Sequence, residues 1–157
     1  MNNDKRIGQV LGGWVIHEMI GEGGNAKVYR VTRADEVAAM KILFKTHWRN
    51  ERLLRFRDEV EGMKKCQGLP GVLPLLDFSI PEQPTPDAPP WLLSPLAEPV
   101  DKIAGHGMTF IQAIELVRDV AVTLAAMHNR KMSHRDVKPN NLFRFEERWV
   151  VGDLGLT

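Results

Sequence analysis

One polar stretch limits what this chain can fold into more than any other. Residues 134 to 141 run His-Arg-Asp-Val-Lys-Pro-Asn-Asn, between a long helical pattern and two short strand patterns. Asp136 can accept or orient a hydroxyl proton, Lys138 can neutralise a phosphoryl group in transfer, and the amide oxygen of Asn141 can coordinate Mg²⁺. A polar turn without function would rarely hold these residues in this order. The stretch therefore indicates a phosphotransfer loop.

A short acidic motif, Asp153-Leu154-Gly155, follows the second of the two strand patterns. On its own, Asp-x-Gly is a common turn and carries little information. Its position directly after a strand, and shortly after the 134–141 stretch, gives Asp153 weight as a functional residue.

A glycine-rich segment lies near the amino terminus, where residues 21 to 28 run Gly-Glu-Gly-Gly-Asn-Ala-Lys-Val. Glycines let a backbone bend sharply and bring N–H groups against phosphate oxygens. Taken alone the segment is weak, because glycine-rich hairpin turns are common. Strand patterns over 14–20 and 27–32 flank it, whereas a Rossmann fingerprint opens a helix and a Walker loop ends in Gly-Lys-Ser/Thr. Neither of those sites is indicated.

Lys41 lies inside a third strand pattern, 37–43, and three short strands in succession predict an antiparallel meander. A lysine there is usually a strand-face residue with its ammonium in water, so a functional role requires a carboxylate that fixes it. Residues 50–65 form an amphipathic helical pattern that supplies three candidates. Periodicity alone does not choose among Asp58, Glu59 and Glu61.

The remaining pattern alternates strands, a connector and one long helix. We expect a strand over 72–80, with Pro74 at an edge or bulge, and another over 91–94. The proline-rich stretch 81–90 is interpreted as an extended loop rather than a ligand for an SH3-like partner. Thr109 and Gln112 form a capping-box signature at the start of the long helix, and the final strands cover 141–145 and 149–152.

Composition excludes several classes of function. With 21 basic and 20 acidic side chains the net charge is +1, so no bulk attraction to nucleic acid or anionic membrane is expected. Cys66 is the only cysteine, which rules out an internal disulfide and CxxC metal or redox motifs. No apolar run is long enough to span a bilayer or to act as a secretory signal, so we expect a cytoplasmic protein.

In their order along the chain, the four segments resemble the eukaryotic-type protein kinase family, and the bacterial Hanks-type members in particular. The resemblance extends from about Leu11 to the last residue. The lysine at position 138 of the loop looks like the serine/threonine branch of the family. It implies an α+β protein-kinase-like fold: an antiparallel five-stranded N-lobe with one helix, followed by a partial, mainly helical C-lobe. The lobes would cover residues 1–97, including the hinge, and 98–157.

The resemblance also implies ATP and Mg²⁺ as cofactors and assigns the chemistry. Asp136 would be the catalytic base, and Lys138 would contact the γ-phosphate. Lys41 would bind the α- and β-phosphates, held by Glu59, which is preferred because residues 56–60 look like the family's helix segment. Asn141 and Asp153 would be the metal ligands.

The implied nucleotide-binding residues form a larger set. They are Gly21, Gly23 and Gly24 over the phosphates; Val28, Ala39 and Phe143 around the adenine ring; Pro95 and Ala97 at its hydrogen-bonding edge, next to a gatekeeper at Ser94; and Asp101 at the ribose. By the same resemblance, His134 and Arg135 look structural.

Three departures from the family pattern stand out. Ala26 replaces the usual third glycine, which is tolerable if its φ is negative. Leu154 replaces the usual phenylalanine and would still fill a core site. The sequence given stops at Thr157, at the start of the activation segment, without the later helices and the peptide-docking surface.

We therefore expect an ATP-dependent phosphotransferase acting on Ser/Thr hydroxyls of proteins. The alternatives are a non-catalytic, pseudokinase-like nucleotide-binding module and a small-molecule kinase of the aminoglycoside type. We also expect the 157-residue chain alone to be a poor or inactive phosphotransferase. Apolar residues around much of the 109–129 helix would promote its self-association.

Overall fold

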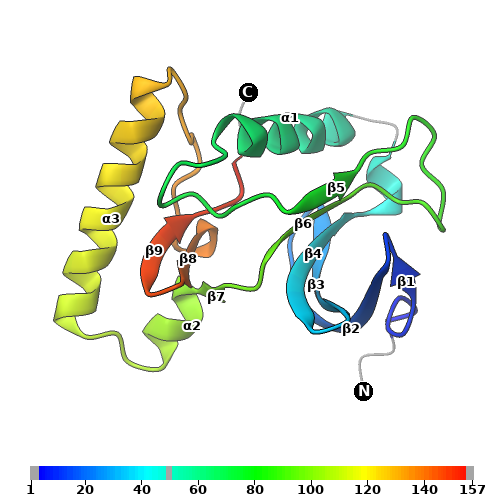
Figure 1. Cartoon of the computed structure of the whole chain (residues 1–157), viewed down its shortest axis with the longest axis horizontal. Coiled ribbons are helices and arrows are strands. Elements are labelled where there is room, and N and C mark those ends of the chain that lie inside the picture. Colours follow the sequence, from blue (N-terminus) through cyan, green and yellow to red (C-terminus); the bar gives the residue numbers. More distant parts are fainter. Residues whose placement is uncertain (1–3, 49–50, 155–157) are drawn as a thin grey trace. The chain divides into compact units, whose positions relative to one another are not determined.

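The computed structural model describes residues 4–48 and 51–154, which group into two units along the chain (Figure 1). Unit 1 comprises Met1–Arg57 and Leu75–Leu96, and unit 2 comprises Asp58–Pro74 and Ala97–Thr157. Helix α1 (Glu51–Lys65) is continuous across the boundary, so its first turns belong to unit 1 and the remainder belongs to unit 2.

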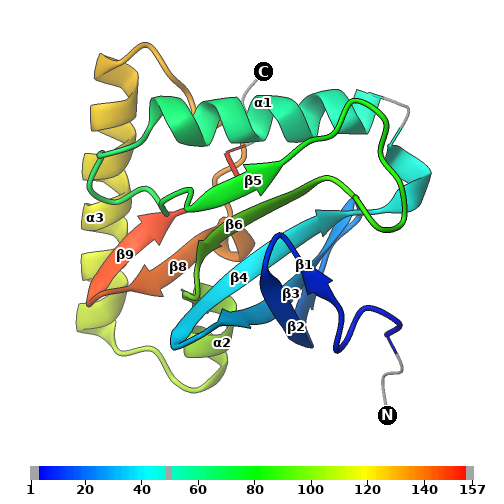
Figure 2. The same cartoon turned by 45° about the vertical axis from the view of Figure 1, so that its right-hand side comes forward.

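Unit 1 is built on an antiparallel sheet of six strands in the order β1-β2-β3-β4-β6-β5 (Figure 2). The strands are β1 (Val10–Leu11), β2 (Trp14–Glu22), β3 (Ala26–Arg33), β4 (Glu36–Leu43), β5 (Asp77–Ser79) and β6 (Trp91–Pro95). The expectation of five strands was one short. Strand β1 has two residues, too few for an alternating pattern, and it forms through the tight turn at Gly12 and Gly13, both of which have positive φ.

The core of unit 1 lies on one face of this sheet. Alternate residues of each strand supply it, as the period of two requires. Its buried members are Leu11, Trp14, Ile16, Tyr29, Val31, Ala38, Met40, Ile42, Trp91 and Leu93. Gly12 packs so closely on this core that a Cβ there would lie 2.4 Å from the Trp91 ring. A side chain at position 12 would therefore displace the tryptophan.

The amino-terminal segment is fixed to β3 by a buried carboxylate. Asp4 accepts hydrogen bonds from Lys27 Nζ at 2.7 Å and from the Tyr29 hydroxyl at 2.9 Å. Burial opposes ionisation of Asp4, but the hydrogen bonds from Lys27, the Arg6 backbone and Tyr29 together lower its pKa. Strand β3, which follows the glycine-rich turn, is thus held by these side-chain contacts in addition to its backbone hydrogen bonds with β2 and β4.

A single strand was expected over 72–80, and this prediction was wrong. The segment between α1 and β6 pairs in two separate places. Val72 forms an isolated parallel bridge with Val151, and the Leu73 N–H donates to the Val151 carbonyl at 2.8 Å. Pairing resumes only at β5, since Pro74 has no N–H with which to continue a ladder. The proline-rich stretch 81–90 is a loop, as interpreted, closed by two backbone hydrogen bonds between Thr85 and Ala88.

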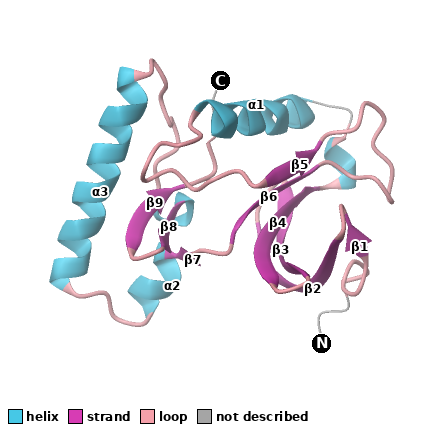
Figure 3. Ribbon diagram, viewed as in Figure 1, coloured by secondary structure: helices cyan, strands magenta, loops and turns pink. Residues whose placement is uncertain are grey.

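Unit 2 combines two helices, α2 (Val100–Gly105) and α3 (Phe110–Asn129), with a three-stranded sheet (Figure 3). The sheet order is β7 (Glu98–Pro99), β8 (Leu142–Phe145) and β9 (Arg148–Val151). Each unit also contains one short 3₁₀ turn, at Lys45–His47 in unit 1 and at Pro139–Asn141 in unit 2. The predicted capping box is confirmed: the Thr109 hydroxyl accepts from the Gln112 N–H, and the Gln112 side chain accepts from the Thr109 N–H. Together the two units confirm the α+β class.

None of the helices among the described residues combines the length and apolar character needed to cross a bilayer. Helix α3 instead has one buried side, with Val120, Thr123 and Met127, which packs beside β9. Its other side exposes apolar residues. They are Phe110, Ile111, Ile114, Val117 and Val122, each at least half exposed.

A close backbone contact joins the segment after α1 to α3. Gly71 has a φ of +89°, and a Cβ at this position would lie 2.0 Å from the Thr123 hydroxyl. The Gly71 carbonyl accepts a hydrogen bond from the Val151 N–H at 2.8 Å. Gly71 therefore sets how closely this segment approaches both α3 and β9.

We predict that Gly71→Ala lowers the free energy of unfolding by about 2–5 kcal/mol, because it combines left-handed strain with overpacking. Gly68→Ala is the matched control, since Gly68 has a φ of +78° and no atom within 4 Å of the added Cβ. The control should lose only about 1–2 kcal/mol. Urea unfolding measures both, and Thr123→Ala should restore part of the loss in Gly71→Ala. Equal losses at the two glycines would contradict the packing argument.

Candidate active site

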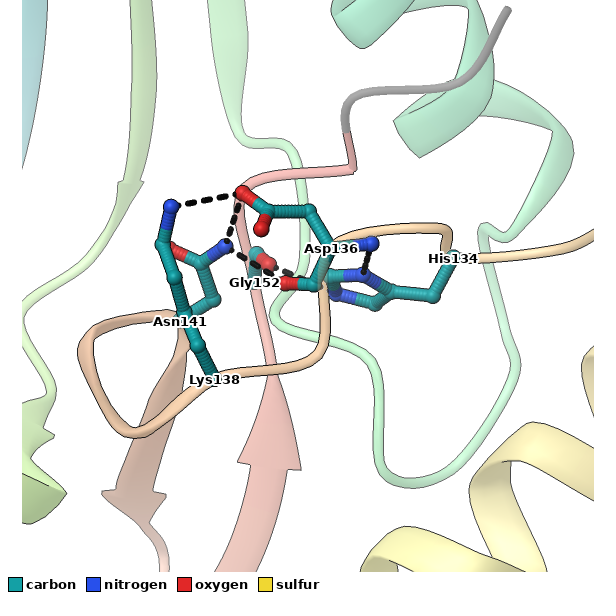
Figure 4. Close-up of polar contacts among 5 residues, drawn as sticks. All are labelled: His134, Asp136, Lys138, Asn141 and Gly152. Carbon is teal, nitrogen blue, oxygen red and sulfur yellow. Dashed lines mark hydrogen bonds and ion pairs between the residues drawn. The ribbon is translucent and has the colours of Figure 1, made fainter.

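The loop between α3 and β8 brings together two of the expected catalytic residues, Asp136 and Lys138, and one expected metal ligand, Asn141 (Figure 4). The Asp136 carboxylate accepts hydrogen bonds from Lys138 Nζ at 2.7 Å and from Asn141 Nδ2 at 3.0 Å, both on Oδ2. Asn141 Nδ2 also donates to the Asp136 carbonyl at 2.8 Å. The carboxylate is half exposed. It is held in place from two sides and still reaches solvent.

His134 fixes the start of this loop through both of its ring nitrogens. It is 1% exposed, its Nε2 lies 3.0 Å from the Gly152 carbonyl oxygen, and the Asp136 N–H lies 3.4 Å from its Nδ1. Because Nδ1 accepts, the proton of a neutral ring is on Nε2, which donates to Gly152. His134 therefore orients the backbone of Asp136, in line with the structural role that the resemblance implied.

Gly152 completes the link between the loop and β9. Its N–H donates to the Asn141 carbonyl at 2.8 Å, while its own carbonyl accepts from His134. A Cβ at Gly152 would lie 2.9 Å from the Phe143 ring. Gly152 was not among the residues expected at the site. A glycine directly before an acidic residue at a strand end is the signal that could have revealed it.

Asp153 follows Gly152 with an unusual backbone. Its φ is +54°, in the left-handed region that non-glycine residues seldom adopt, and Arg135 has a φ of +63°. Strained residues of this kind cluster at functional sites. Asp153 directly follows Gly152, the residue that links β9 to the catalytic loop.

The net effect of the surroundings lowers the pKa of Asp136. The largest cause is the hydrogen bond from Lys138, and the hydrogen bond from Asn141 acts in the same direction. Partial burial and the charge of Asp153 oppose them. Asp136 consequently stays ionised to lower pH than an ordinary aspartate.

Three of the expected nucleotide-binding residues of unit 1, Val28, Ala39 and Lys41, share one face of the sheet. Val28 pairs with Lys41 across β3 and β4, and Ala39, two residues earlier on β4, pairs with Ser94. Directly paired residues and residues two apart lie on the same face. This is the face opposite to the core, which takes Ala38, Met40 and Ile42 from the same strand.

The glycine-rich loop closes above this face through backbone contacts. Gly21 pairs with Val28, and the Gly23 N–H donates to the Ala26 carbonyl at 3.0 Å. The left-handed residues of the described chain do not include Ala26, so its methyl group is accommodated. They do not include Gly21, Gly23 or Gly24 either, so these glycines are not required by φ. Their contribution is the absence of a side chain.

Apart from Pro95, which belongs to unit 1, the remaining expected residues lie in unit 2. Glu59 is 6% exposed on α1, whereas Asp58 and Glu61 are exposed and Glu61 pairs with Lys64 at 2.7 Å. The others lie along β6 to β8: Pro95 ends β6, Ala97 follows it, Asp101 is on α2 and Phe143 is on β8. Leu154 is fully buried, as expected of an apolar residue that fills a core position.

Comparison with known proteins decides the family. A family model described as the protein kinase domain matches residues 14–157. The chain belongs to the protein kinase domain family. This kinase domain is 29% identical to a probable serine/threonine-protein kinase of Clostridium perfringens over 155 residues, which covers 96% of the chain and 22% of that protein. It is 24% identical to the serine/threonine-protein kinase ArnS of Sulfolobus acidocaldarius, covering 90% of the chain and 26% of that protein.

The fold is shared with a solved kinase domain. A crystal structure of the PknI kinase domain of Mycobacterium tuberculosis superimposes with a TM-score of 0.72 at 22% identity, covering 96% of this kinase domain and 61% of that chain. The kinase domain therefore spans about a quarter of the length of these curated relatives and less than two thirds of the solved domain.

We predict that Lys138→Met raises the pKa of Asp136 toward the usual aspartate value, because it removes the largest cause of the lowering. Carboxyl ¹³C titration by NMR, without nucleotide, measures this shift. Lys102→Met is the matched control: it removes the same charge from an exposed position on α2. The control should leave the Asp136 titration unchanged. A Lys138→Met titration identical to that of the wild type would show that the pair does not persist in solution.

Proposed function

We propose that this kinase domain transfers the γ-phosphate of ATP to Ser/Thr hydroxyls of proteins. The observation that carries the proposal is the arrangement of Asp136, whose carboxylate is bound by Lys138 and Asn141 within 3.0 Å and is exposed to an incoming group. Family membership and relatives named serine/threonine-protein kinases support the same reaction.

In the proposed reaction the protein contributes position and charge. Asp136 accepts a hydrogen bond from the substrate hydroxyl and orients the oxygen for attack. Lys138, already beside Asp136, places a positive charge where the phosphoryl group is transferred. Because Lys138 is 50% exposed, it can exchange this contact for a phosphate oxygen without a large desolvation cost.

The residues present fit a magnesium ion. Asn141 donates through Nδ2 to Asp136, so its planar amide directs Oδ1 away from that carboxylate. Amide and carboxylate oxygens are suitable Mg²⁺ ligands, with phosphate and water completing the coordination. Among residues 4–48 and 51–154, no three His, Cys, Asp or Glu side chains form a metal cage. Asn141 and Asp153 would thus hold the ion together with ATP, and the ion would neutralise phosphate charge.

We propose that Glu59, rather than Asp58 or Glu61, is the partner of Lys41. A buried carboxylate needs a cation or several hydrogen bonds, whereas an exposed one is hydrated. Glu59 is the buried member of the three, and both Glu59 and Lys41 are engaged in interactions. Lys41 would then bind the α- and β-phosphates, while Gly21, Gly23 and Gly24 cover them and Val28, Ala39 and Phe143 contact adenine.

Two alternatives make different predictions. A non-catalytic nucleotide-binding module would bind ATP without transferring phosphate, and the presence of Lys41, Asp136, Asn141 and Asp153 argues against it. A small-molecule kinase would phosphorylate aminoglycosides rather than protein, and the relatives' names argue against that.

The need for ATP and the free thiol of Cys66 support a cytoplasmic location.

We predict that Mg·ATP raises the unfolding temperature of the wild-type chain. At an Mg·ATP concentration 100 times the dissociation constant, the free energy of unfolding should increase by about 2.7 kcal/mol. Lys41→Met should weaken Mg·ATP binding in calorimetry.

Asp136→Asn should keep binding but reduce phosphotransfer roughly 10²–10⁴-fold in a chain that includes the activation segment. The transfer assay compares a Ser/Thr protein with an aminoglycoside panel. Undiminished transfer by Asp136→Asn would disprove the assignment of the base.

We also propose that the exposed side of α3 causes self-association of this chain, and we predict an apparent mass that rises with concentration in light scattering. Phe110, Ile114 and Val117 are 80%, 53% and 69% exposed at helical spacing, and such a stripe favours burial against a second copy. Ile114→Glu should reduce the association. Leu54→Glu, at a 57% exposed apolar residue on α1, is the matched control and should not. A concentration-independent monomer would contradict the proposal.

A further inference from the structure

The glycine-rich loop is held by a side chain to which the family resemblance assigns no role. Arg52 lies in the first turn of α1, and its Nη1 donates to the Gly24 carbonyl at 3.1 Å and to Asn25 Oδ1 at 2.5 Å. All three residues belong to unit 1. The contact spans 28 residues of sequence and joins the helix to the tip of the loop.

The loop has little packing of its own at this point. A Cβ at Gly24 would find no atom within 4 Å, and one at Gly23 would reach only the Ala26 carbonyl at 4.0 Å. Hydrogen bonds therefore decide its conformation. Two are between backbone groups: Gly23 N–H to the Ala26 carbonyl at 3.0 Å, and Phe44 N–H to the Asn25 carbonyl at 2.9 Å. Arg52 adds a side-chain restraint to the peptide between them.

This restraint fixes the direction of a backbone donor. In a planar trans peptide, the carbonyl of one residue and the N–H of the next point in opposite directions. The described chain contains no cis peptide bond. When Arg52 holds the Gly24 carbonyl toward α1, it therefore directs the Asn25 N–H the other way. Backbone N–H groups are what a glycine-rich loop offers to phosphates.

We propose that Arg52 is a positioning residue for the nucleotide: it orders Gly24 and Asn25 so that the loop amides are oriented before the phosphates arrive. This inference rests on the proposed ATP binding. An exposed contact contributes little to global stability, so loss of Arg52 should disorder the loop without unfolding unit 1. The expected effect is on loop opening and nucleotide affinity.

The test compares Arg52→Gln with Arg55→Gln in the whole chain. Arg55 is also exposed on α1, and its side chain makes no hydrogen bond or ion pair with any residue that the structure describes. Calorimetry measures the Mg·ATP dissociation constant, and hydrogen exchange without nucleotide measures protection of the Gly23 and Phe44 amides. Arg52→Gln should weaken Mg·ATP about three- to tenfold and speed exchange at both amides to a similar degree. Arg55→Gln should match the wild type in both.

Further variants separate position from charge. Asn25→Ala removes one of the two acceptors, so it should show a smaller effect, and it should add little to Arg52→Gln because both act through the same contact. Arg52→Lys keeps the charge without the forked donors and should recover only part of the affinity. Equal weakening by Arg52→Gln and Arg55→Gln would overturn the proposal, because charge alone would then explain it.

Failure of the proposed function would give a different result. If the wild-type chain bound no Mg·ATP, ATP binding would be disproved, and with it the nucleotide half of this inference. The exchange comparison would still decide whether Arg52 orders the loop. Unchanged protection at Gly23 and Phe44 in Arg52→Gln would overturn that half as well.

Discussion

The candidate catalytic site depends on the two hydrogen bonds of Gly152. Its N–H binds the Asn141 carbonyl at 2.8 Å, and its carbonyl accepts from His134 at 3.0 Å. Since these partners bracket Asp136, the loop that carries the carboxylate is held in register with β9. Asp153 is the next residue, so one glycine determines the placement of both acidic groups. The Phe143 ring, which would lie 2.9 Å from an added Cβ, would have to shift for any other residue type at this position.

The two units position their functional residues by different means. In unit 1, packing determines the arrangement: Ala38, Met40 and Ile42 enter the core, and the alternation of β4 then turns Ala39 and Lys41 to the other face. In unit 2, polar contacts around Asp136 determine it. Loss of a core side chain in unit 1 costs cavity energy and stability, whereas loss of Lys138 changes a pKa.

The sequence indicated the residues of the catalytic loop and the capped start of α3 because each depends on neighbours a few positions away. Residues 72–80 did not follow their pattern, because Val72 pairs with Val151, far along the chain, and Pro74 interrupts the strand. Strands β1 and β7, of two residues each, carry no periodicity at all. The role of Arg52 was not predicted for the same reason: its partners, Gly24 and Asn25, are brought to it only by the tertiary fold.

The glycines of the glycine-rich loop are not required by backbone conformation. Glycine was expected there for sharp bending and for bringing N–H groups against phosphate oxygens, yet Gly21, Gly23 and Gly24 have no left-handed φ. What the loop requires is an open surface with oriented amides, and the orientation comes from Arg52 on α1. The other end of α1 is fixed within unit 2, where Arg130 donates to the Lys65 carbonyl at 3.2 Å. Arg52 and Arg130 thus hold the two ends of α1 through contacts that lie within separate units.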